Sequence, residues 1–210
     1  MKKKTLTVAI ALVLVVALAV GATYAYLKDS TKTIENTFVA GKLFDNGGIK
    51  LQEKDVTAKE DGTYEIKADA EWKDAGYTYT VQPGVDLPKQ PAVRVSGLDT
   101  NAYVFVGVKG TAIPGKFDWS VDTAIWEPLM NNGTQVVKGD YTIWKLKGDA
   151  SGYATNGDFD ILTGNQVAVD DEFDPAVLTA ANNIEFQAYI CQSAGFDSAY
   201  DAFNASFLSK

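Results

Sequence analysis

The chain has 210 residues, of which 46% are hydrophobic and 22% charged, and it carries 27 acidic against 19 basic side chains. This composition is typical of a globular protein with one sizeable domain. The sequence has no histidine and a single cysteine, Cys191. These counts exclude Ser-His-Asp triads, Cys-His dyads, His-based zinc sites, intramolecular disulfides and Cys-rich metal sites. What remains is a binding or structural protein, or an enzyme built on carboxylates, lysine, serine or tyrosine.

The first segment is typical of a signal peptide. Lysines at positions 2–4 precede an uncharged apolar run over residues 6–22. Small side chains, Thr23 and Ala25, follow at the two positions that a signal peptidase reads. We expect a signal-peptide helix over residues 1–25 and cleavage after Ala25. The alternative is an uncleaved membrane anchor, because a membrane-spanning helix needs ~20 apolar residues and this run is only slightly short.

Cleavage would leave residues 26–210 with a larger acidic excess. Three of the 19 basic side chains are lost and all 27 acidic ones remain, so the net charge falls from −8 to −11. Such a surface repels nucleic acid and anionic lipid headgroups. We therefore expect no nucleic-acid partner, and membrane contact only through the uncleaved signal segment.

A two-residue hydrophobic period dominates the rest of the chain and predicts strands with one buried face. The predicted strands cover residues 33–44, 49–56, 63–68, 77–82, 92–96, 103–108, 117–121, 135–138, 141–146, 165–169 and 184–191. Gly-containing turn signals separate them. The pattern predicts a mainly β fold, an antiparallel β-sandwich of jelly-roll type in one domain over residues 26–210.

A C-terminal helix is expected to close one end of the sandwich. Ser198 and Asp201 have the spacing of a capping box. An aromatic and alanine stripe follows at three- and four-residue steps and indicates packing against the core; it comprises Phe196, Ala199, Tyr200, Phe203 and Phe207. A second short helix is predicted after Asp174, with Pro175 in its first turn.

The search for chemistry finds no catalytic motif, and we expect no catalytic residue and no cofactor. A weak candidate calcium site is the loop formed by Asp170, Asp171, Glu172 and Asp174, because four carboxylates gather there. Solvated loop charge is the favoured interpretation of this cluster. A carboxylate-pair glycosidase stays open, since any two of the acids could lie at the needed separation. Cys191 ends a strand pattern and is expected to be a partly buried structural thiol, and the four tryptophans are expected to fill the core.

Three stretches of the sequence carry a resemblance to a known family. The first is GATYAYLKDS at residues 21–30, followed by NTFVAGKL at 36–43. The second is VQPGVDLPKQPAVRV at 81–95, running into NAYVFVGVK at 101–109. The third covers residues 184–203 and contains AGFDS. In this order they resemble the TasA- and camelysin-like exported proteins, whose signal peptides are cut by the dedicated SipW peptidase.

The resemblance implies a jelly-roll subunit of extracellular fibres, in a biofilm matrix or on the cell surface. It also implies that the arm at residues 26–38 completes the sheet of the next subunit as a donor strand. The arm begins at Tyr26 and has Leu27, Ile34 and Phe38 as sparse apolar anchors, which suits strand addition to an open sheet edge. An equally weighted alternative is that the arm forms the first strand of its own sheet.

Camelysin-like relatives carry a metalloprotease label, but this chain offers zinc carboxylates in place of the usual nitrogen and sulfur ligands. We therefore expect a secreted, non-enzymatic protein that associates with itself, with other matrix proteins or with cell-wall polymer. The alternatives are a monomeric surface- or carbohydrate-binding module and, ranked lower, a carboxylate-based hydrolase.

Overall fold

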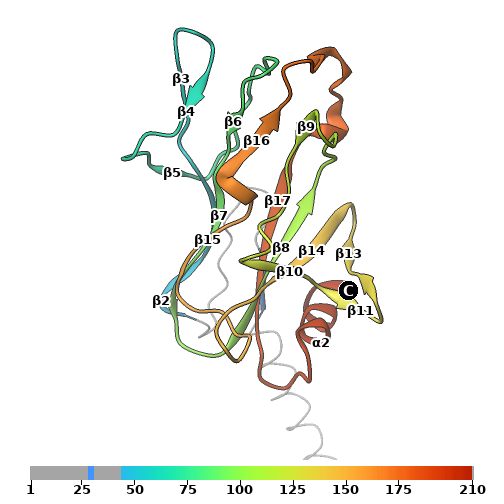
Figure 1. Cartoon of the computed structure of the whole chain (residues 1–210). Helices are drawn as coiled ribbons and strands as arrows, with labels where there is room; N and C mark the ends of the chain where they lie inside the picture. The colour runs from blue at the N-terminus through green and yellow to red at the C-terminus, as the bar shows by residue number, and fades with distance from the viewer. Residues whose placement is uncertain (1–27, 31–43, 210) are drawn as a thin grey trace, which may run out of the picture.

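The computed structural model describes residues 28–30 and 44–209 (Figure 1). The predicted signal peptide, its cleavage residues Thr23 and Ala25, and most of the arm lie outside this part of the chain. The described part is mainly β, with antiparallel sheets and one C-terminal helix, as the sequence predicts. No helix in it combines the length and the apolar character needed to span a membrane.

The larger sheet contains the first and last strands side by side. Its order is β1 (Lys28–Ser30), β17 (Glu185–Gln192), β8 (Ala102–Lys109), β14 (Tyr141–Leu146) and β10 (Trp126–Pro128), with β13 (Val137–Lys138) also paired to β14. Every pairing is antiparallel. The longest is β8 with β17, which runs in register from Ala102 opposite Gln192 to Lys109 opposite Glu185.

A second sheet faces the first. Its order is β15 (Gly157–Asp160), β7 (Pro91–Leu98), β2 (Phe44–Lys54) and β5 (Trp72–Lys73). Alternate residues of both sheets meet in a shared core that includes Ile49, Val93, Val104, Val106 and Ile190. The two-residue hydrophobic period of the sequence arises because the two sheets pack face to face and every second residue of a strand points into the shared core.

The C-terminal helix covers the outer face of the larger sheet. Helix α2 (Ala199–Phe203) continues into the π-helical turn η4 (Asn204–Leu208). Its Phe203 packs against Phe105 of β8 and Tyr189 of β17, with ring centroids 4.9 and 5.4 Å away. β8 and β17 are thus buried on both faces, by the second sheet and by this helix. The Ser198 side chain caps the helix by accepting from the Asp201 backbone N–H.

Smaller elements extend one end of the molecule, above the sandwich in Figure 1. A short sheet joins β6 (Leu87–Pro88), β16 (Gln166–Val169) and β9 (Phe117–Asp118). Its core includes Phe117 stacked on Phe173. The hairpin of β3 (Thr57–Ala58) with β4 (Tyr64–Glu65) lies at the same end, whereas the hairpin of β11 (Met130–Asn131) with β12 (Thr134–Gln135) lies beside the C-terminal helix (Figure 1). Short 3₁₀ turns are η1 (Thr163–Asn165), η2 (Pro175–Val177) and η3 (Ala180–Asn182).

One predicted strand is absent. Residues 77–82 form no strand, because side chains take over part of their hydrogen bonding: the Tyr64 hydroxyl accepts from the Thr80 N–H, and Tyr79 bonds outside the segment. The short helix predicted after Asp174 is present as the 3₁₀ turn η2, which has Pro175 in its first turn and is capped by the Asp174 side chain. Residues 157–160 are not among the predicted strands, but they form β15.

Candidate functional site

The outer edge of β17 is the first part of the candidate site, because the N-terminal strand is added there. β1 pairs antiparallel with β17, with Lys28 opposite Cys191 and Ser30 opposite Tyr189. Among the described residues this pairing covers three positions of β17, whereas β8 pairs with β17 along its whole length. The structure thus places residues 28–30 of the predicted arm as an edge strand of the chain's own sheet.

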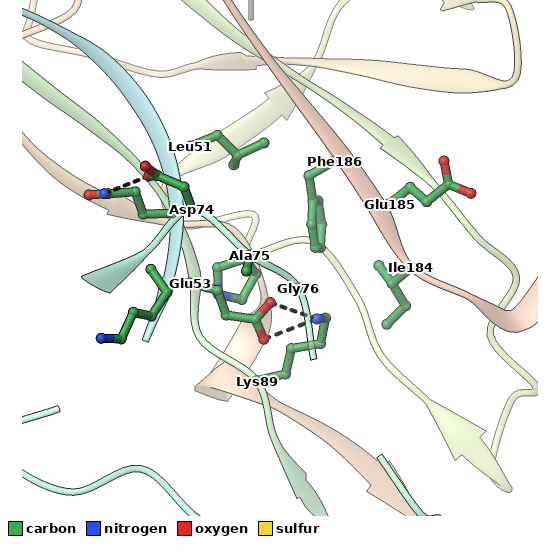
Figure 2. A pocket seen from close by; sticks show the side chains of 12 residues that line it. Leu51, Glu53, Asp74, Ala75, Gly76, Lys89, Ile184, Glu185 and Phe186 are labelled. Atoms are coloured by element: carbon green, nitrogen blue, oxygen red, sulfur yellow. Dashed lines mark hydrogen bonds and ion pairs between the residues drawn. The ribbon is translucent and has the colours of Figure 1, made fainter. Parts of the chain in front are cut away.

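A hollow of about 210 Å³ lies beside the other end of β17, between the two sheets (Figure 2). Apolar side chains make up much of its wall: Leu51 of β2, Pro91 at the start of β7, Phe186 of β17 and Ile184 just before it. Leu51 follows Ile49 on the inward face of β2, so the hollow is the open end of the sandwich core. The close approach of β8 to this end requires Gly110, since a Cβ there would lie 2.7 Å from the Asn183 carbonyl oxygen.

A buried ion pair forms one side of the hollow. The Lys89 ammonium lies 3.0 and 2.9 Å from the two carboxylate oxygens of Glu53, and both side chains are almost fully buried. The Tyr79 hydroxyl donates to the Pro88 carbonyl at 2.7 Å and lies 3.4 Å from Glu53 Oε1. Burial raises the pKa of Tyr79 well above its ordinary value, and the Glu53 charge adds to the effect. The Tyr79 hydroxyl is therefore a proton donor, not a base, at neutral pH.

Lys89 and Ile184 also line a second hollow, of about 280 Å³. Its lining includes residues 77–79 and 182–184, together with the apolar side chains of Leu87, Phe117 and Val167. The hydroxyl of Tyr77 donates to Asp55 at 2.6 Å, which fixes its ring at the rim. Aromatic rings and amide side chains thus line the second hollow, whereas the first is largely apolar.

Charged groups also surround the start of β17. The Tyr141 hydroxyl donates to Glu185 Oε2 at 2.7 Å, and Lys109 lies 3.1 Å from Oε1. These two contacts hold the pKa of Glu185 below its ordinary value. Burial, together with the Glu185 charge, raises the pKa of Tyr141 to about 12. Tyr141 packs in the core under α2, whereas Phe186 packs in the core shared by the two sheets. The contact with Tyr141 therefore places the Glu185 side chain on the face of β17 opposite that of Phe186.

The predicted acidic loop is held by protein groups. Asp170 lies 2.5 Å from the Lys116 ammonium, and this contact lowers the pKa of its carboxyl group. Asp174 caps η2, and Glu172 lies 3.7 Å from the same ammonium. Within residues 28–30 and 44–209, no three metal-ligating side chains gather at a cation-sized site. The closest charged partner of this acidic loop, which comprises Asp170, Asp171, Glu172 and Asp174, is therefore Lys116.

Some of the remaining predicted residues lie outside the described part of the chain, and the others lie within it. The arm residues Tyr26, Leu27, Ile34 and Phe38 lie outside the described part of the chain. Cys191 is buried, as expected, on the face of β17 that α2 covers. Trp126 is fully buried in the shared core, but Trp72 lies on a sheet edge beneath Lys54 and Arg94. That position corrects the expectation that all four tryptophans fill the core.

Sequence reasoning missed Glu53 and Lys89. Neither stands in a motif, and a charge on a strand is normally solvated. One signal was available: Glu53 continues the inward-facing series of Ile49 and Leu51, so the two-residue period places it inside. Three carboxylate residues line the first hollow, and all are engaged: Glu53 by Lys89, Asp74 by the side-chain amide of Gln52 at 2.8 Å, and Glu185 by Tyr141 and Lys109.

Three comparisons with known proteins returned no match: no protein-family model, no curated protein and no solved structure is similar to this chain.

Proposed function

We propose that the protein is a secreted, non-enzymatic subunit of extracellular fibres, of the biofilm-matrix or cell-surface kind, with a jelly-roll type of sandwich. Subunits join head to tail: the N-terminal arm of one copy, residues 26–38, adds as a strand to the edge of β17 in the next. The single observation that carries the proposal is the antiparallel pairing of β1 with β17. It marks where a strand from this arm fits.

The geometry permits exchange of the arm between copies. An edge strand is held mainly by backbone hydrogen bonds, each of which contributes about 0.5–1.5 kcal/mol, and any chain of similar sequence can supply them. A neighbour's arm therefore fits the same edge as the chain's own arm. Because donor arm and acceptor edge are different surfaces, the contact is heterologous, and it gives an open filament when the rotation between subunits does not close a ring.

The test compares the mature chain, residues 26–210, with a version that begins at residue 39, by negative-stain electron microscopy. We expect fibres from the first and monomers from the second. A matched control keeps the arm and changes an exposed residue of η2, Val177→Ser, and should still form fibres. If the truncated chain forms the same fibres as the mature chain, strand exchange is wrong.

A second candidate function is supported by the second hollow. Tyr77, Tyr79, Asn182 and Asn183 line it, and aromatic rings with amide groups are a common combination in sugar-binding sites. A monomeric carbohydrate-binding module would stay monomeric in light scattering and would be retained on cell-wall polysaccharide. Loss of that retention in Asn182→Ala and Asn183→Ala variants would favour this function over the fibre subunit.

A further inference from the structure

The first hollow contains a buried ion pair within a largely apolar lining. Glu53 and Lys89 are only 6% and 7% exposed, and they line the hollow together with Leu51, Pro91 and Phe186 (Figure 2). Burying such a pair is costly, and replacing it with apolar residues of similar volume is often neutral or stabilising. A few precisely placed polar groups in an apolar pocket are, in contrast, the usual composition of a ligand-binding site.

The ion pair keeps unused hydrogen-bonding capacity. A lysine ammonium has three donors, and Lys89 directs its contacts at the two Glu53 oxygens, at 3.0 and 2.9 Å. A carboxylate accepts at about four positions. Within the described part of the chain Glu53 has three such contacts, two with Lys89 and one, at 3.4 Å, with the Tyr79 hydroxyl. One donor of Lys89 and one acceptor position of Glu53 therefore remain for a bound molecule.

The charges of the hollow select a neutral ligand. The two charges of the pair balance, so an anion would meet Glu53 and a cation would meet Lys89 at close range. The other charged residues of the lining already have partners: Lys73, Asp74 and Glu185. An entirely apolar ligand would cover the pair without satisfying its remaining donor and acceptor, which costs free energy. The ligand is therefore neutral, with polar groups on the side that meets the pair.

Two adjacent hydroxyl groups fit the pair. One hydroxyl donates to Glu53 while its neighbour accepts from Lys89, because a hydroxyl can do either. Leu51, Pro91 and Phe186 offer apolar surface to the carbon–hydrogen groups of the same molecule. A sugar ring combines adjacent hydroxyl groups with an apolar face that packs on an aromatic side chain. The volume of about 210 Å³ is below the roughly 300–1,000 Å³ of drug-sized sites and suits a single ring.

We propose that the first hollow binds one neutral sugar ring, whose adjacent hydroxyl groups bond to Glu53 and Lys89 and whose apolar face packs on Phe186. The second hollow shares Lys89 and Ile184 with the first, so the rest of a longer glycan continues there. The site does not depend on fibre formation. It adds a glycan contact to the fibre subunit.

The experiment titrates the mature chain, residues 26–210, with the methyl glycosides of glucose, galactose, mannose and N-acetylglucosamine, followed by ligand-observed NMR. We expect saturable binding of at least one of them. Gly76→Leu should weaken that binding by about tenfold or more, because added bulk at the lining narrows a hollow that suits a single ring. A Cβ at Gly76 meets no atom within 4 Å, so the variant leaves the ion pair and the fold intact.

A second variant removes the ion pair itself. The double variant Glu53→Leu, Lys89→Met should also weaken binding by about tenfold or more, because both charged partners of the hydroxyl groups are lost. The matched control Lys59→Met removes a lysine from an exposed ion pair and should bind like the unmodified chain. Folding of each variant is checked by cooperative urea unfolding, and Gly76→Leu carries the test if the double variant does not fold.

A pair of simpler probes tests the recognition of adjacent hydroxyl groups. Cyclohexane-1,2-diol and cyclohexanol share the apolar ring and differ in one hydroxyl group. We expect cyclohexanol to bind about tenfold more weakly, or less, because it leaves either Glu53 or Lys89 without its additional partner. Equal affinity for the two probes would refute this mode of recognition.

The remaining outcomes also decide. If none of the four glycosides binds, the sugar site does not exist. Binding that survives both Gly76→Leu and the double variant occurs elsewhere on the chain and refutes the site as well. Assembly of the same samples is examined by electron microscopy. Fibres without sugar binding overturn this inference alone, whereas sugar binding without fibres overturns the proposed function alone.

Discussion

The ion pair of Glu53 and Lys89 is the most unusual residue-level feature of the molecule. Removing two opposite charges from water costs several kcal/mol per ion, and the cost is recovered only with good geometry. Here both carboxylate oxygens contact the ammonium, which also lies 5.9 Å from the ring centroids of Tyr79 and Phe186. Both charges therefore have close partners in the intact pair. Replacing either residue alone would leave the other charge buried without its partner.

We expect Lys89→Met to lower the free energy of unfolding by about 3–5 kcal/mol, because Glu53 stays buried without its cation. The double variant Glu53→Leu, Lys89→Met should recover most of the loss. Urea unfolding followed by circular dichroism measures both. In the exposed pair of Lys59 and Glu65, Lys59→Met should change stability by less than about 1 kcal/mol. Equal losses of stability in Lys89→Met and Lys59→Met would contradict this account.

Single residues divide clearly into predictable and unpredictable ones. The burial of Cys191 and Trp126 follows from their positions in apolar patterns. The pairing of Glu53 with Lys89 joins residues far apart in sequence, and only the folded arrangement brings them together. The expectation that Trp72 fills the core is wrong, because this large aromatic residue gains cation–π contacts with Lys54 and Arg94 at the sheet edge.

At the scale of elements, the central strands define the molecule. β8 alternates valines toward the second sheet with Phe105 toward α2, and β17 alternates in the same way. Such regular alternation is predictable from sequence because its period is that of a strand. The segment at residues 77–82 alternates as well but is not a strand, since alternation reports burial of one face and not backbone pairing.

Helix α2 and the larger sheet should lose stability together when their shared core is opened. Phe203 is fully buried, and its ring lies 4.9 to 5.4 Å from those of Phe105, Tyr189 and Phe207. We expect Phe203→Ala to cost about 3–5 kcal/mol, measured by urea unfolding, because the helix cannot fill the cavity. The control Val177→Ala, at a side chain 53% exposed, should stay within about 0.5 kcal/mol. Equal losses would show that α2 adds little to the sheet.

At the scale of the whole molecule, charge opposes association. If residues 1–25 are removed, each copy of the chain carries a net charge of −11, and like-charged copies repel. Salt screens such repulsion over about 10 Å at 0.1 M ionic strength. The chain has no histidine, so protonation near neutral pH cannot reduce the charge.

We therefore expect fibre formation, followed by light scattering, to accelerate with added salt and on acidification near pH 4–5, where ordinary carboxyl groups titrate. Glu185 and Asp170 have lowered pKa values. Each of these two carboxylates stabilises the folded protein at pH values above its pKa in the unfolded chain. That stabilisation is lost as the pH falls through the lower pKa that the group has in the folded protein. Assembly should thus begin before these contacts are lost. An acceleration centred near pH 6.5, or slower assembly in salt, would contradict the charge argument.

The pairing of β1 with β17 also sets an order in time. Synthesis proceeds from the N-terminus, so Lys28–Ser30 appears early, while its partner residues 189–191 appear almost last. The central pairing of β8 with β17 must wait for the same residues, and contacts this distant in sequence form slowly. During that interval the arm has no edge of its own. A neighbour that has already folded does offer one, so the rate at which a chain joins others competes directly with the rate at which it closes on itself.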